Sequence, residues 1–205
     1  MYLHKTPKWL RGIFPDILWN INTDAKEIYL TFDDGPIPDV TPWVLEQLEQ
    51  YNAKATFFMV GDNISKYKAV FTEVLNRQHT LGNHTFNHLN GWNTISRTYI
   101  DNISKAEKLL GTNSVQLFRP PHGRLKWSQY KKIKKSFKIV MWDVLSGDFS
   151  SSLSPENCLK NSIRATVPGS VIVFHDSAKN LDKLKYVLPR YLEHFAALNF
   201  TFKAL

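Results

Sequence analysis

The chain has 205 residues, of which 43% are hydrophobic and 21% charged, and its formal net charge is +8. This length suits one α/β domain spanning residues 1–205, and the composition is ordinary for a soluble globular protein. No apolar run approaches the length of a membrane span, which excludes a membrane-spanning chain. Cys158 is the only cysteine, so an intrachain disulfide is excluded as well.

The positive charge would suit a polyanionic partner such as nucleic acid. The densest basic cluster, however, is interrupted at helical spacing by Ile133 and Phe137. It consists of Lys131, Lys132, Lys134 and Lys135. Lysines in this pattern are typical of the exposed face of a helix. The sequence therefore predicts a solvated basic surface and argues against nucleic acid as the partner.

Residues 1–27 precede the first predicted strand. Basic residues ahead of Ile13 and Phe14 resemble the start of a signal peptide, but Pro15 and Asp16 interrupt any continuous apolar region. A role at a membrane interface is the alternative for this segment. We expect instead that it packs against the rest of the domain.

Apolar strand-like runs alternate with amphipathic helical stretches in the remainder of the chain. In chain order the predicted elements are strand Ile28–Phe32, helix Thr41–Tyr51, strand Ala55–Val60, helix Ser65–Arg77, strand His79–Gly82, helix Ser96–Leu110, and strands Val115–Phe118, Lys138–Trp142, Ser170–Phe174 and Phe200–Lys203. Thr41 as N-cap with Pro42 at the first helical position, and Gly111 after the helix that ends at Leu110, are ordinary helix boundaries. Repeated alternation of this kind indicates a parallel sheet with helices outside it.

Polar residues lie at the carboxyl ends of these strands, and they decide between an open sheet and a barrel. They are Asp33, Asp34, His84, Arg119, Asp148 and His175. In a closed β/α barrel all strand ends meet at one mouth, whereas an open sheet gathers only those beside its switch point. The pattern therefore predicts a distorted (β/α) barrel with about seven parallel strands over residues 28–203.

Asp33 and Asp34 follow the first strand directly and precede a Gly-Pro turn. Two carboxylates so close together repel each other unless a cation neutralises one or they share a proton. His84 and His88 are four residues apart and, if their segment begins a helix, both rings can reach one ion. These four residues are candidates for a metal site.

Five ordered segments resemble the polysaccharide deacetylases, which are metal-dependent carbohydrate esterases acting on chitin, peptidoglycan and related N-acetylated sugars. The segments are Thr31–Pro36, His84–His88, Arg119–Gly123, Asp148–Phe149 and Val171–Asp176. The resemblance covers nearly the whole chain from Ile28 onwards. It implies a distorted (β/α) barrel, in agreement with the pattern of strands, and the hydrolysis of N-acetyl groups on a sugar.

The resemblance also implies a set of metal ligands. Asp34, His84 and His88 would hold the metal, with Zn²⁺ as the default and Co²⁺ or another divalent ion as alternatives. Two imidazoles and one carboxylate leave positions open for water and substrate, as a catalytic site requires.

The same resemblance implies roles for the other polar residues. Asp33 would be the general base, and Arg119 would pair with it. His175 would be the general acid that protonates the departing amine, and Asp148 would orient this histidine. The backbone N–H of His122 would help to hold the oxyanion.

The chain departs from the family pattern at two positions. His122 stands where a tyrosine or phenylalanine is usual, and Phe149 stands where a tryptophan is usual. We place Pro121, Phe149 and Trp92 in the substrate groove, with Phe149 and Trp92 as faces on which a sugar can stack. The departures put the substrate preference in doubt rather than the chemistry.

Two other functions compete with an N-deacetylase. An O-acetyl sugar esterase would use the same site, and a basic module that binds anionic polymers would use the barrel only as a scaffold. The complete set of metal and acid-base residues argues against the binding module. Because no signal peptide is seen, we expect a cytoplasmic monomer that acts on short N-acetylated oligosaccharides.

Overall fold

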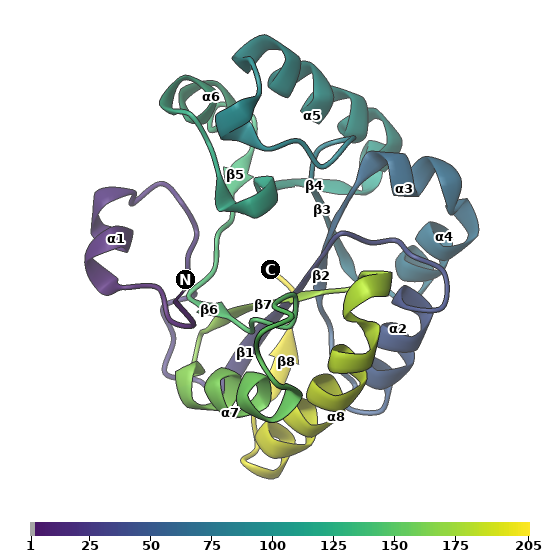
Figure 1. Cartoon of the computed structure of the whole chain (residues 1–205), viewed down its shortest axis with the longest axis vertical. Helices are drawn as coiled ribbons and strands as arrows, with labels where there is room; N and C mark the ends of the chain where they lie inside the picture. Colours follow the sequence, from purple (N-terminus) through teal and green to yellow (C-terminus); the bar gives the residue numbers. More distant parts are fainter. Residues whose placement is uncertain (1–2) are drawn as a thin grey trace.

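The parallel strands form a sheet that curls into an incomplete barrel (Figure 1). This computed structural model describes residues 3–205. The strands are β1 (Glu27–Asp33), β2 (Thr56–Met59), β3 (Thr80–Asn83), β4 (Ser114–Phe118), β5 (Lys138–Ile139), β6 (Val144–Leu145), β7 (Val171–His175) and β8 (Thr201–Lys203). Seven of them follow the order β5-β4-β3-β2-β1-β7-β6, and β8 pairs with β1. The predicted distorted barrel is thus confirmed.

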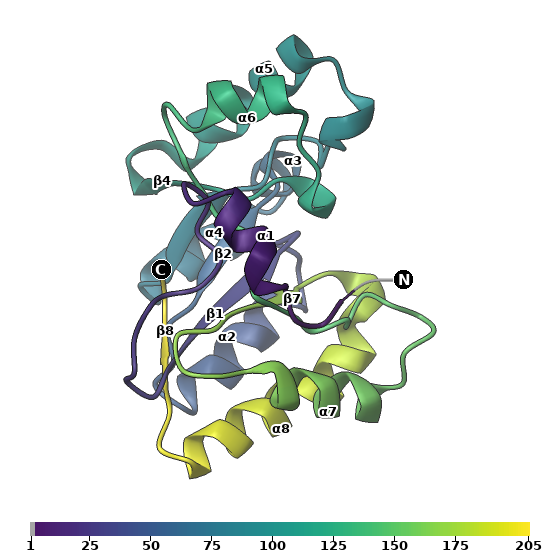
Figure 2. The same cartoon turned by 90° about the vertical axis from the view of Figure 1, so that its left-hand side faces the viewer.

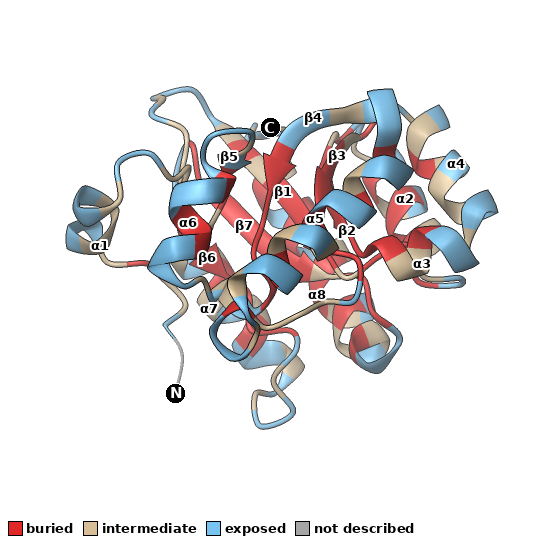
Figure 3. Ribbon diagram, turned by 90° about the horizontal axis from the view of Figure 1, so that it is seen from above, coloured by how far each residue is buried: buried red, intermediate tan, exposed pale blue. Residues whose placement is uncertain are grey.

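Helices surround the sheet, with their exposed faces outward and the strands buried inside (Figure 3). They are α1 (Lys8–Ile13), α2 (Thr41–Glu49), α3 (Gly61–Lys66), α4 (Lys68–Asn76), α5 (Ser96–Leu110), α6 (Trp127–Ile133), α7 (Pro155–Ala165) and α8 (Leu181–Ala197). Short 3₁₀ turns lie at Gly91–Asn93 (η1), Gly111–Asn113 (η2), Pro121–Gly123 (η3) and Ala178–Asn180 (η4). None of the helices within residues 3–205 has the length and apolar character needed to cross a bilayer.

Alternate residues of each strand face opposite sides, and this separates the packed core from the barrel interior. In β1, Leu30 and Phe32 belong to the core under the helices, and the Phe32 ring stacks on Phe57 at a centroid distance of 5.1 Å. Thr31 and Asp33 point to the other side. The barrel interior therefore receives the polar residues of the central strand.

The structure differs from the sequence-based prediction in two elements. The helix expected over 65–77 is two helices, α3 and α4, which meet at Tyr67, where φ is −121° and ψ is 53°. The strand expected over 138–142 ends at Ile139, and the unpredicted β6 follows it. Two-residue strands are too short to produce a periodic pattern, so the sequence could not reveal β6.

The N-terminal segment lies between the two edges of the sheet. Leu18 forms a bridge with Val140 next to β5, and Lys5 forms one with Val144 in β6. In Figure 2 this segment and α1 cross in front of the strands. Trp19 is buried, whereas Trp9 and Ile13 in α1 are exposed. Much of the described part of this segment therefore packs on the barrel, but one face of α1 does not.

A buried carboxylate ties this segment to the sheet. Asp143 is 1% exposed and accepts hydrogen bonds from Lys5 Nζ at 2.7 Å and from the Val171 backbone N–H at 2.9 Å. Ser170 Oγ donates to the same carboxylate at 3.1 Å. Burial raises the pKa of Asp143, against the opposing effect of Lys5. The three hydrogen bonds hold the Asp143 carboxylate in place between the N-terminal segment and β7.

We predict that Asp143→Ala lowers the free energy of unfolding by about 2 kcal/mol, because it leaves the buried Val171 N–H without an acceptor. Urea denaturation followed by circular dichroism measures this. Asp16→Ala is the matched control, since Asp16 pairs with Lys134 at the exposed surface and should change stability little. Equal stability of the two variants would contradict the anchoring role.

Candidate active site

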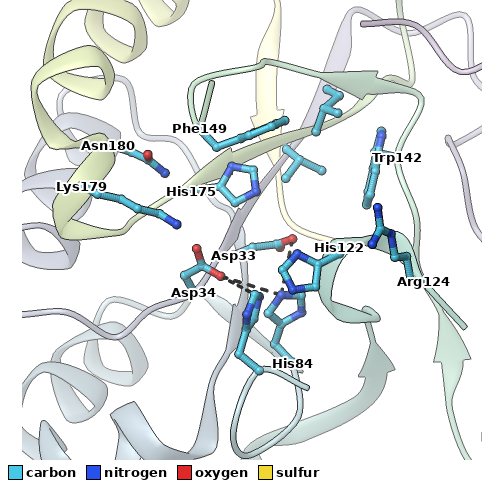
Figure 4. A pocket seen from close by; sticks show the side chains of 13 residues that line it. Asp33, Asp34, His84, His122, Arg124, Trp142, Phe149, His175, Lys179 and Asn180 are labelled. Carbon is cyan, nitrogen blue, oxygen red and sulfur yellow. Dashed lines mark ion pairs between the residues drawn. The ribbon is translucent and has the colours of Figure 1, made fainter. Parts of the chain in front are cut away.

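Two carboxylates at the end of β1 face the same cavity (Figure 4). Asp33 is the last residue of β1 and lies in register with His175 at the end of β7. Asp34 has a φ of 88°, which non-glycine residues rarely adopt. Its carbonyl oxygen accepts a hydrogen bond from Asn63 Nδ2 at 2.8 Å. This backbone turn brings both side chains into one pocket.

Asp34 and two histidines form a cluster whose ligand atoms all lie within 4.8 Å of one another. Nε2 of His88 lies 3.2 Å from Asp34 Oδ1, and Nε2 of His84 lies 3.9 Å from the same oxygen. Ligands about 2.0–2.1 Å from a tetrahedral Zn²⁺ lie roughly 3.3 Å apart, so the donor set and its spacing fit such an ion.

His84 is oriented for this task by a backbone acceptor. Its Nδ1 lies 2.8 Å from the carbonyl oxygen of Arg119. A carbonyl can only accept, so Nδ1 carries the proton and the lone pair of Nε2 faces Asp34. Burial lowers the pKa of His84 to about 4, despite the raising effect of Asp33. The ring is therefore neutral at pH 7, as a metal ligand must be.

Asp34 is ionised for a different reason. Burial alone would raise its pKa, but the hydrogen bond with His88 and the charge of His175 outweigh burial and hold the pKa far below its usual value. A carboxylate that stays charged in a partly buried pocket is suited to bind a cation.

The two histidines do not come together through helical spacing. The segment after β3 is a loop in which Thr85 and His88 have φ of 64° and 53°. Side-chain oxygens bind its backbone N–H groups: Asn83 accepts from Thr85, and Asn102 accepts from the two residues that follow. These acceptors replace the first turn of a helix, so the helical interpretation of the spacing is wrong.

Arg119 holds Asp33 inside the barrel. The guanidinium is fully buried, and its Nη1 donates to Asp33 Oδ1 at 2.8 Å and to Thr31 Oγ1 at 2.7 Å. The second oxygen, Oδ2, lies 3.9 Å from His84 Nε2. One carboxylate oxygen is therefore fixed by Arg119, and the other faces the cluster of candidate metal ligands.

His175 and Asp148 form a second buried pair across the pocket. Nδ1 of His175 lies 2.8 Å from Asp148 Oδ1, and the His175 backbone N–H donates to Oδ2 at 2.7 Å. Burial would lower the pKa of His175, but the charge of Asp148 and its hydrogen bond raise it to about 9. The ring is therefore protonated at pH 7, and its Nε2 edge is left for the pocket.

The cavity between these pairs has a volume of about 390 Å³, and Phe149 and His122 line it. His122 has a φ of 59°, and its ring packs on His88 at a centroid distance of 4.7 Å. Phe149 lies against His175, with ring centroids 5.2 Å apart. Pro121 is buried, and Trp92 lies in a neighbouring cavity.

Three comparisons with known proteins bear on the family of this chain. The sequence profile of the polysaccharide deacetylase family matches residues 20–141. A chitooligosaccharide deacetylase of Azorhizobium caulinodans is 32% identical over 82% of this chain and 90% of its own length. The chain belongs to the polysaccharide deacetylase family.

Other relatives agree with this assignment. A peptidoglycan-N-acetylglucosamine deacetylase of Bacillus cereus is 34% identical over 82% of this chain, which spans 64% of that protein. The crystal structure of a peptidoglycan N-acetylglucosamine deacetylase with a bound N-oxidanyl-benzamide superposes with a TM-score of 0.88 at 29% identity. That match covers 98% of this chain and 95% of the other.

Several residues of this pocket were missed from the sequence. Arg124 and Trp142 line the side opposite Lys179 and Asn180 (Figure 4). Trp142 lies in the connection between β5 and β6, and Lys179 and Asn180 lie in the 3₁₀ turn η4. Of these four residues, only Arg124 could have been recognised from the sequence, because it stands two residues after His122.

Asp176 was also given no role, although it is fully buried behind the paired carboxylates. Its oxygens accept from the Gly35 N–H at 3.1 Å and from Thr41 Oγ1 at 2.6 Å. A side chain on Gly35 would collide with Asp176. Asp176 therefore fixes the turn that follows Asp34. Its position directly after His175 was the available signal.

We predict that Asp34→Asn and His84→Ala weaken Zn²⁺ binding by about a hundredfold or more, beyond the roughly 10–100-fold that the loss of an outer partner costs. Asp33→Asn should keep the ion, because the structure places Asp33 on Arg119. Elemental analysis after dialysis against graded Zn²⁺ buffers measures retention. Equal loss in Asp33→Asn and Asp34→Asn would contradict the division of roles.

Proposed function

We propose that this protein is a metal-dependent hydrolase that removes N-acetyl groups from a carbohydrate. One observation carries the proposal: a candidate ligand triad lies in the same pocket as a carboxylate paired with arginine and a histidine paired with aspartate. Base, acid and Lewis-acid site are the three elements that amide hydrolysis needs. The names of the relatives, which include peptidoglycan and chitooligosaccharide deacetylases, support a sugar substrate.

Asp34, His84 and His88 would hold the metal, and Zn²⁺ fits two imidazoles and one carboxylate best. When bound, such an ion polarises the acetyl carbonyl and lowers the pKa of a water molecule towards about 7. Phe149 lines the same pocket and would contact the acetylated sugar.

Asp33 would be the general base. Its Oδ1 is occupied by Arg119, so Oδ2 is the atom that takes the proton from the attacking water. The buried guanidinium holds the carboxylate in a fixed orientation. Without Arg119 an unpaired charge would remain inside the barrel, which is costly.

His175 would be the general acid. Asp148 accepts from Nδ1, so Nε2 carries the proton that is given to the departing amine. Amine anions are very poor leaving groups, and a histidine with a pKa of about 9 is largely protonated at neutral pH. The backbone N–H of His122 would stabilise the oxyanion. An amide needs this proton more than an ester does, because an alkoxide leaves with less help.

The proposal is tested by acetate release from N-acetylated oligosaccharides and from O-acetylated sugars. We expect turnover of the N-acetylated series, its loss on exhaustive chelation and its recovery with Zn²⁺ or Co²⁺. His175→Ala should lose amide turnover by at least about a hundredfold, the usual contribution of a positioned acid. Release confined to O-acetyl sugars would favour the esterase, and full activity of chelated, metal-free protein would refute the mechanism.

The pH dependence gives an independent prediction. The acid must be protonated, so the rate should fall as pH rises through the pKa of His175, near 9. Asp148→Asn removes the charge that raises this pKa and should move the basic limb to lower pH by about 1–3 units. Initial rates between pH 6 and 10 measure the shift. Asp182→Asn, an exposed acid on α8, is the control, and a limb that stays in place in Asp148→Asn would remove Asp148 from this role.

A further inference from the structure

The helix α1 turns two large apolar side chains towards solvent. Trp9 is 67% exposed and Ile13 is 59% exposed, and residues four apart lie on the same face of a helix. On the inner side, Leu10 and Phe14 line a second cavity, of about 430 Å³, between the N-terminal segment and α6. The inner side chains therefore hold α1 on the barrel, and its outer face is left in water.

Two more exposed apolar side chains lie close to α1. Phe14 contacts Trp127, the first residue of α6, at a centroid distance of 6.4 Å, and Trp127 is 58% exposed. Ser128 Oγ lies 2.8 Å from Ser96 Oγ at the start of α5, so Ile95, which is 75% exposed, borders the same surface. In Figure 2, α1 and α6 lie on the side of the barrel that faces the viewer. The apolar patch defined in this way consists of Trp9, Ile13, Ile95 and Trp127.

The grouping of these side chains distinguishes them from ordinary surface residues. Exposed apolar side chains that are scattered singly are common, whereas a patch in adjoining elements indicates an interaction surface. The ring of Trp127 is also held in place, because it stacks on Tyr130 at a centroid distance of 4.9 Å with an interplanar angle of 19°. Since this ring is already ordered, less side-chain entropy is lost when a partner covers it.

Lysines border the apolar patch. Lys8 at the start of α1, Lys126 before α6 and Lys131 within α6 are all exposed. The Nζ of Lys131 lies 5.4 Å from the centre of the Trp127 ring, so the ammonium group sits beside the indole. A lysine in this position can bury its aliphatic stem along an apolar surface and keep its charge in a polar layer.

Acidic residues are scarce around the apolar patch, which makes its border positively charged. No acidic residue occurs in the sequence between Arg119 and Trp142, the stretch that contains α6. Asp16 is the one acidic residue among residues 1–23, and it pairs with Lys134 at 2.8 Å. The surface is therefore apolar at its centre and complementary to an anionic partner at its border.

Indole and aliphatic side chains bordered by lysines are typical of surfaces that enter the headgroup layer of a bilayer. A nucleic acid would engage the lysines but would gain nothing from Ile13 and Ile95. We propose that the apolar patch and its lysines bind the surface of a membrane that contains anionic lipids. None of the four patch residues lines the catalytic pocket. The inference therefore goes beyond the proposed function and does not depend on it.

Co-sedimentation of the full chain with vesicles of phosphatidylcholine, with and without phosphatidylglycerol, tests the proposal. We expect binding to the vesicles that contain phosphatidylglycerol, weakened by added salt because the surface charges are screened. Trp127→Ala should weaken this binding by about tenfold, since a large apolar side chain no longer leaves water. Leu198→Ala is the matched control, because Leu198 is an exposed apolar residue after α8, remote from the patch. Absence of binding, or equal binding by the two variants, would overturn the proposal.

A second pair of variants separates the border lysines from the net charge of the protein. Lys131→Gln should weaken vesicle binding by about fivefold, whereas Lys185→Gln on the exposed face of α8 makes the same change in net charge and should have little effect. An equal loss in both variants would indicate a general charge effect and overturn the proposal. Acetate release measured without vesicles should be unchanged in Trp127→Ala and Lys131→Gln, which shows that they fold.

Quenching of tryptophan fluorescence by lipids brominated in their acyl chains tests insertion directly in the wild type. We expect quenching on binding, and less of it in Trp9→Phe and Trp127→Phe. Trp43→Phe is the control, because this ring packs against the core. Vesicle binding without quenching would overturn insertion of the patch. Tight, salt-dependent binding of an oligonucleotide without any binding to vesicles would overturn the proposal in favour of a polyanion.

Discussion

The buried guanidinium of Arg119 is the interaction on which the site depends. It donates to Thr31 and Asp33 in β1, and to the backbone carbonyls of Val140 and Met141 beyond β5. Phe58 lies under it at 4.2 Å. A single cation thus links the central strand to one edge of the sheet through the barrel interior. Asp33 supplies the counter-charge. The attraction within the ion pair offsets the free-energy cost of removing each charge from water, which either ion alone would leave uncompensated.

This ion pair explains why the other site residues lie where they do. The backbone carbonyl of Arg119 also accepts a hydrogen bond from His84. Arg119 therefore orients His84 through its backbone and the Asp33 carboxylate through its guanidinium. The parallel strands end at one mouth, and His175 reaches it from β7 with Asp148 behind. Asp33 and His175 are therefore placed by the ends of two neighbouring strands, and His84 directly follows a third.

Much of this arrangement could be predicted from the sequence. Polar residues placed after apolar runs indicated which side chains would meet, because parallel strands end on the same side of a barrel. Five ordered motifs then indicated the family. The loop that carries His84 and His88 was not predictable from spacing, because side-chain acceptors from Asn83 and Asn102 replace a helix there. Asp143 and the second cavity depend on contacts between residues more than a hundred positions apart, such as Phe14 with Trp127.

The position of the N-terminal segment has a consequence for the order of folding. Lys5 meets Asp143 and Asn20 forms a bridge with Ser170, so this segment pairs with partners that are synthesised much later. Until those partners emerge, the segment has no sheet edges to lie between, and its aromatic side chains stay in water. Contacts of such high sequence separation form late and slowly. The wall of the second cavity that carries Phe14 would accordingly be among the last parts of the molecule to take shape during synthesis.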